Sequence, residues 1–81
     1  MWGNESTGLE RREWFSLLAA FYALAHSDQG PFHALPLKLR THPAGELCRL
    51  FIDTGDSDLL NEAGLMLTGT ENWYVYIGRM I

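Results

Sequence analysis

The sequence predicts an α+β fold in which one long N-terminal helix packs on a small antiparallel sheet of three or four strands. Residues 9–26 contain no Pro or Gly and consist mostly of good helix formers. Leu35, Leu37 and Leu39 alternate with other residues, which is the period of a half-buried strand. Residues 73–77 are aromatic or β-branched, a composition typical of strands.

The first helix is expected to begin at a capping box of Thr7 and Glu10 and to end before Gly30. From Trp14 to Ala25 nearly every side chain is apolar, so apolar groups surround the helix instead of forming one stripe. One face is expected to pack on the rest of the chain, and the other to be covered by a second copy, another partner or the N-terminal arm that carries Trp2. A homodimer joined through Trp14 to Ala25 is therefore one predicted assembly.

Two interpretations remain open for the middle of the chain. In the first, the strand at residues 35–39 lies at a sheet edge, because Pro36 donates no ladder hydrogen bond, and a turn leads into a second strand at residues 46–53. In the second, residues 43–52 form a short helix capped by Thr41, with Pro43 in its first turn.

The last third of the sequence is predicted to hold one short helix and two strands. Asp56 or Ser57 is expected to cap the helix, and Gly64 to end it. Residues 65–67 and 73–77 then flank a polar linker and form the strands.

The balance of charge disfavours a general nucleic-acid binder. We treat the 81 residues as one domain (1–81). They carry ten acids against six bases and a net charge of −4, so the chain has no excess of positive charge with which to neutralise phosphates. Bases concentrate in residues 32–49, whereas residues 50–78 hold acids without one Lys or Arg. The simplest expectation is that these stretches pair on the surface, where a salt bridge contributes roughly 0–1 kcal/mol.

Binding to a partner is predicted to involve two tyrosines and four acids. If Trp73, Val75 and Ile77 face the core of the sheet, the alternate tyrosines face outward and resemble interface anchors, although the opposite register swaps the faces. The candidate binding residues are Tyr74, Tyr76, Asp56, Asp58, Glu62 and Glu71.

A second functional hypothesis starts from residues 50–55, which run Leu-Phe-Ile-Asp-Thr-Gly. This segment resembles the active-site loop of retroviral-type aspartic proteases. The resemblance implies a retropepsin-like homodimer in which Asp53 is the catalytic carboxylate and shares a proton with its symmetry mate. The same tripeptide is also ordinary turn chemistry, because Asp and Thr cap turns and Gly adopts positive φ.

The remaining reactive residue types indicate no metal and no cofactor. Cys48 is the single cysteine, so it forms no intramolecular disulfide and is expected to be a buried apolar residue in a reducing, cytoplasmic environment. His26, His33 and His42 are far apart in sequence and are expected to have structural roles. The apolar run from Trp14 to Ala25 is too short to span a membrane, which takes about 20 residues.

Together these observations predict a small acidic protein-binding module that is not an enzyme. Its expected partner is a protein, such as a nucleic-acid-handling protein with a basic surface, and not nucleic acid itself. In size and acidity the chain is similar to small phage-encoded inhibitors, anti-CRISPR proteins among them, which implies an inhibitory role. The alternatives are a dimeric aspartic hydrolase centred on Asp53 and a self-assembling structural subunit.

Overall fold

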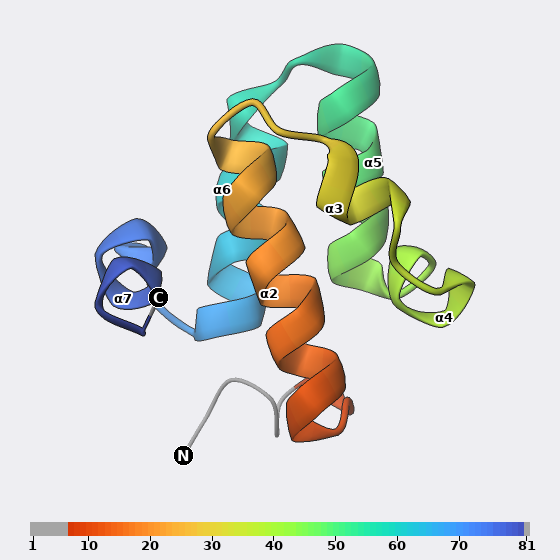
Figure 1. Cartoon of the computed structure of the whole chain (residues 1–81). Helices are drawn as coiled ribbons and strands as arrows, with labels where there is room; N and C mark the ends of the chain where they lie inside the picture. The colour runs from red at the N-terminus through yellow and green to blue at the C-terminus, as the bar shows by residue number, and fades with distance from the viewer. Residues whose placement is uncertain (1–6, 81) are drawn as a thin grey trace.

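The computed structural model describes residues 7–80, and this part of the chain contains helices and no strand (Figure 1). The predicted α+β fold with an antiparallel sheet is therefore wrong. The helices are α2 (Arg11–Ala25), α3 (Gly30–His33), α4 (Leu37–Arg40), α5 (Pro43–Thr54), α6 (Ser57–Thr68) and α7 (Trp73–Met80).

Helix α2 is the predicted long helix, but its start differs. It begins at Arg11, and the backbone N–H of Glu10 donates to Oε1 of Glu13 at 3.1 Å, so Glu10 and Glu13 replace the expected box of Thr7 and Glu10. It ends at Ala25, as expected from the turn residues that follow.

The apolar surface of α2 is largely covered by other helices of the same chain. Its buried side chains are Trp14, Leu17, Leu18, Ala20, Phe21 and Leu24. Figure 1 shows α2 in the centre of the molecule, with α6 alongside it, and contacts extend to α3, α5 and α7. Phe15 is the large apolar residue of α2 that stays exposed. A homodimer through this helix stays a prediction, but covering the helix does not require one.

The predicted edge strand at residues 35–39 is wrong, because this segment contains a bend and the start of α4 and no strand. Leu35 and Leu39 are buried, whereas the side chain between them, Leu37, is 66% exposed. Pro36 has an extended backbone and caps α4, so Leu35 precedes the helix and Leu37 and Leu39 belong to it. A strand would place all three leucines on one face, which their burial contradicts.

Of the two interpretations of residues 43–52, the hairpin is wrong and the helix is confirmed. Pro43 occupies the first turn of α5, and the cap is His42 instead of Thr41. The His42 ring accepts a hydrogen bond at Nδ1 from the Ala44 N–H (3.1 Å) and donates from Nε2 to the Thr7 carbonyl (2.8 Å). His42 therefore ties the start of α5 to the residues that precede α2.

Helix α6 begins as predicted and continues past the predicted end. The Asp56 carboxylate caps it by accepting from the Asp58 N–H at 3.0 Å. The helix then passes through Gly64 and ends at Gly69, which has a φ of 75°. Gly64 is buried and lies against the Trp73 ring, so the absence of a side chain serves close contact with α7. The predicted strand at residues 65–67 is the last part of α6.

The predicted final strand is also a helix, α7. Trp73 and Ile77 are buried four residues apart, whereas Val75, which a strand would place on their side, is 44% exposed. Trp73 packs edge-on against Phe21 of α2, with ring centroids 4.7 Å apart. The aromatic and branched composition favours a strand locally, but no second strand is present in residues 7–80 to pair with it.

Candidate protein-binding surface

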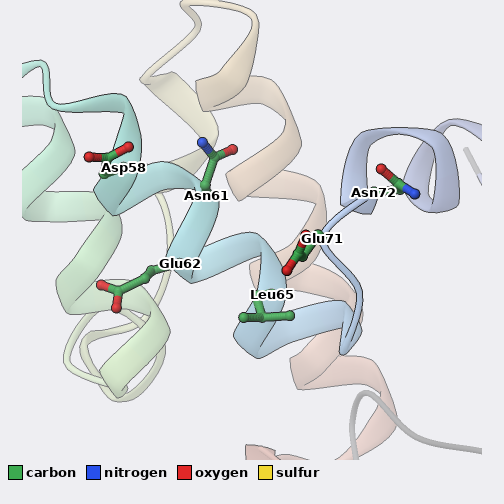
Figure 2. A pocket seen from close by; sticks show the side chains of 6 residues that line it. All are labelled: Asp58, Asn61, Glu62, Leu65, Glu71 and Asn72. Atoms are coloured by element: carbon green, nitrogen blue, oxygen red, sulfur yellow. The ribbon is translucent and has the colours of Figure 1, made fainter.

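A shallow pocket of about 430 Å³ lies along α6 and the segment that leads into α7. Figure 2 shows its six side chains, four from α6 and two from the segment before α7. We call this set the α6 surface: Asp58, Asn61, Glu62, Leu65, Glu71 and Asn72. Three of the six predicted binding residues, namely Asp58, Glu62 and Glu71, therefore line one pocket.

Helical spacing aligns the first four of these residues. Positions 58, 61, 62 and 65 follow the spacing i, i+3, i+4 and i+7 and so occupy one side of α6. Asp58 lies in the first turn, where the positive end of the helix dipole favours a carboxylate. Treating residues 57–68 as one helix would have revealed this alignment from sequence, but Gly64 suggested a helix end.

Hydrogen bonds between residues close in sequence hold the linker that carries Glu71. The Thr68 hydroxyl donates to the Gly64 carbonyl at 2.7 Å and accepts from the Thr70 N–H at 3.3 Å. The Asn72 N–H donates to the Thr70 hydroxyl at 3.2 Å. These bonds set the path of residues 69–72 and thereby place Glu71 next to α6.

Asn61 fixes the other side of the pocket. Its Oδ1 accepts a hydrogen bond from the Trp73 indole N–H at 3.1 Å, which joins α6 to the start of α7. The Trp14 indole N–H similarly donates to the Leu67 carbonyl at 2.7 Å, so α2 supports α6 from the buried side. The pocket is therefore built on elements that are tied to the core.

The carboxylates of the α6 surface make no ion pair with any described residue, contrary to the simplest expectation from sequence. Arg49 pairs with Glu46 and Asp53 on its own helix, and Lys38 pairs with Glu13 of α2 at 2.7 Å. The basic middle stretch thus reaches the acidic stretch only through Asp53 among residues 7–80. Among residues 7–80, therefore, no cation lies within ion-pair distance of the carboxylates of the α6 surface.

A second hollow, of about 520 Å³, adjoins the first between α5 and α6. We call it the apolar groove, and its lining residues are Pro43, Leu47, Glu62, Leu65 and Met66. Glu62 and Leu65 line both hollows, so acidic and apolar surfaces meet along α6. Leu65 and Met66 are 44% and 38% exposed. This groove was not predicted from the sequence, because residues 65–67 were expected to form a strand.

The other predicted binding residues lie elsewhere or have another role. Tyr74 is 57% exposed on α7, whereas Tyr76 is half-buried and packs against the core, so the two tyrosines do not share an outer face. Two residues apart on a helix they point in nearly opposite directions. Asp56 is occupied in capping α6.

The setting of Asp53 differs from the one that the protease resemblance implies. Asp53 and Thr54 belong to the last turn of α5, and Gly55 ends that helix with a φ of 73°. The Asp53 carboxylate is exposed and accepts from Arg49 at 3.2 Å. The hairpin and strand that would precede a protease loop are absent from residues 7–80. The hydrolase hypothesis thus loses the fold on which it rested.

Cys48 and the histidines do not belong to the α6 surface. Cys48 is fully buried, and burial raises the pKa of its thiol to about 12, which confirms it as an apolar core residue. His26 and His33 bond to groups four residues away on their own segments. Within residues 7–80, no three acidic, histidine or cysteine side chains gather into a group able to hold a metal ion.

In the described part of the chain, no helix has the length and apolar character needed to cross a membrane. No protein-family model matches the chain, and no curated protein or solved structure is significantly similar to it. The geometry and charge of the α6 surface are therefore the features that bear on function.

Proposed function

We propose that this protein is a non-enzymatic binding protein whose α6 surface engages a basic surface of another protein. The observation that carries the proposal is the uncompensated charge of Asp58, Glu62 and Glu71 around one pocket, although the chain has bases elsewhere. Left without intramolecular partners in residues 7–80, these carboxylates attract cations from outside.

The partner class follows from the same chemistry. Proteins that handle nucleic acids present clustered Lys and Arg to phosphates, and such a cluster complements three carboxylates on a fixed frame. A protein that covers this cluster competes with the nucleic acid, so an inhibitory role is part of the proposal. A cytoplasmic location is also part of it, supported by a single buried cysteine with no disulfide partner.

We propose that the protein is not an enzyme because neither Asp53 nor Cys48 is in a state suited to catalysis. Asp53 is exposed and ion-paired, and the thiol of Cys48 is buried with a raised pKa, so neither is prepared as a nucleophile or a shared-proton carboxylate.

Two double variants that remove the same charge test the proposal. Glu62→Gln with Glu71→Gln removes two of the three charges of the α6 surface, whereas Glu10→Gln with Glu46→Gln removes two charges elsewhere, at the N-cap of α2 and in α5, where they pair with Arg12 and Arg49. Each tagged form is used for a pull-down from lysate of the source organism or its host at low and high salt. We expect one stoichiometric basic partner that the wild type and the Glu10/Glu46 variant retain at low salt.

With the purified partner, the Glu62/Glu71 variant should bind about fivefold more weakly, because each exposed charge pair contributes roughly 0.5 kcal/mol. Equal loss in both variants would assign the effect to net charge alone. Wild-type affinity in the Glu62/Glu71 variant, with no dependence on salt, would remove the proposal.

A further inference from the structure

We infer that the apolar groove and the α6 surface together bind an amphipathic basic helix of the partner. This inference rests on the proposed function and adds the form of the ligand. The helix would place its apolar residues between α5 and α6 and its Lys or Arg residues against the adjoining carboxylates.

The groove has the composition of a helix-binding site. Pro43 and Leu47 of α5 lie on one side, four residues apart, and Leu65 and Met66 of α6 lie on the other. About one helical turn of α5 and one of α6 therefore line the groove. This length matches apolar side chains that are spaced by three or four residues on a ligand helix. Met66 adds a flexible thioether that adapts to different apolar partners.

Charge selects the kind of helix. Glu62 lines the groove itself, and Asp58 and Glu71 lie in the adjoining pocket, so every charged residue that lines either hollow is an acid. An apolar stripe flanked by cations is complementary to this arrangement, whereas a helix with acidic flanks would be repelled. Burying Leu65 under the ligand also lowers the local dielectric, which strengthens attraction to the carboxylates.

Two other occupants fit the groove less well. A second copy related by two-fold symmetry would present the same patch and so add a second Glu62, and no base, to the lining of the groove, which like-charge repulsion opposes. An extended peptide usually binds by adding a strand to a sheet edge, and residues 7–80 contain no sheet.

Two synthetic peptides of identical Lys and Leu composition test the inference against the full chain. Each has about 14 residues, roughly four helical turns. In one, the leucines repeat at helical spacing to form a stripe; in the other, the order is scrambled so that no stripe exists. Binding is followed by fluorescence anisotropy at low salt, and we expect the striped peptide to bind about tenfold more tightly.

Variants with unchanged charge locate the site. Met66→Gln and, separately, Leu65→Gln should weaken binding of the striped peptide by about fivefold and leave the scrambled peptide unaffected. Leu37→Gln is the matched control, since Leu37 is also an exposed leucine but lies on α4, outside both hollows. Because all three positions are exposed, circular dichroism should show the same folded helix content.

The outcomes separate the inference from the proposed function. Equal binding of the two peptides, weakened in both cases by Glu62→Gln with Glu71→Gln, would overturn the helix inference and leave the acidic binding surface standing. Failure of both peptides to bind at low salt would overturn both. A dimer, detected by light scattering, that Met66→Gln converts to monomers would overturn the inference by assigning the groove to a second copy.

Discussion

Burial governs the chemistry of individual residues in this protein, and Cys48 is the clearest example. Its thiol lies in the core, and desolvation by burial raises its pKa to about 12. At mildly alkaline pH the native protein should therefore react with a thiol reagent only at the rate of unfolding. The protein in denaturant should react at once and release one equivalent of chromophore.

Rapid modification of native Cys48, with the helical circular dichroism spectrum retained, would contradict this assignment. Cys48→Ala provides the control for reaction at any other group. It should also destabilise the fold, because it leaves a small cavity in the core.

At the scale of the elements, the contact between α6 and α7 depends on Gly64. A Cβ at this position would overlap the Trp73 ring, which is itself held between Phe21 and Asn61. Gly64→Ala should therefore destabilise the protein by about 1–3 kcal/mol, despite the higher helix propensity of alanine. Urea unfolding followed by tryptophan fluorescence measures the change.

Gly78→Ala on α7 is the matched control. Among the described residues, an added Cβ would meet the Tyr22 hydroxyl, at an ordinary contact distance of 3.7 Å. This substitution should stabilise the protein by about 0.5–1 kcal/mol. A stabilising effect at Gly64 as well would mean that Trp73 does not pack on α6 as described.

At the scale of the whole molecule, the ion pair between Glu13 and Lys38 links α2 to α4 and makes stability depend on pH. The hydrogen bond between the two side chains lowers the pKa of the Glu13 carboxyl below its ordinary value of 4.5. The same bond raises the pKa of the Lys38 ammonium above its ordinary value of 10.5. The carboxylate therefore stabilises the fold above its unfolded pKa and loses this effect as pH falls through the folded value. The ammonium stabilises below its unfolded pKa and loses its effect as pH rises through the folded value.

Glu13→Gln should consequently lower the melting temperature near neutral pH, and the difference from wild type should shrink at both extremes. Gln still accepts the Glu10 N–H bond, so the variant isolates the ion pair. Glu62→Gln removes the same charge from a residue without an ion pair among residues 7–80, and its effect should be smaller. A Glu13→Gln difference that persists unchanged in acid would contradict the linkage.

Several features followed from the sequence alone because their causes are local. The long stretch without Pro or Gly predicted α2, the Asp56 carboxylate predicted the start of α6, and the apolar neighbours of Cys48 predicted its burial. The charge asymmetry led to the opposite expectation for Asp58, Glu62 and Glu71, namely that the acidic stretch would pair with the basic one.

Only the tertiary structure decided which period the short segments adopt and which residues meet. The patterns of residues 35–39 and 73–77 favour a strand locally, and the burial of Leu39 and Trp73 in the core between helices decides against it. Gly64 was expected to end a helix, but it lies inside α6 because the Trp73 ring packs against it and leaves no room for a side chain. The meeting of Glu71 with Asp58 and Glu62 depends on the continuation of α6 and on the hydrogen-bonded linker, because proximity between distant residues is set by packing and not by local propensity.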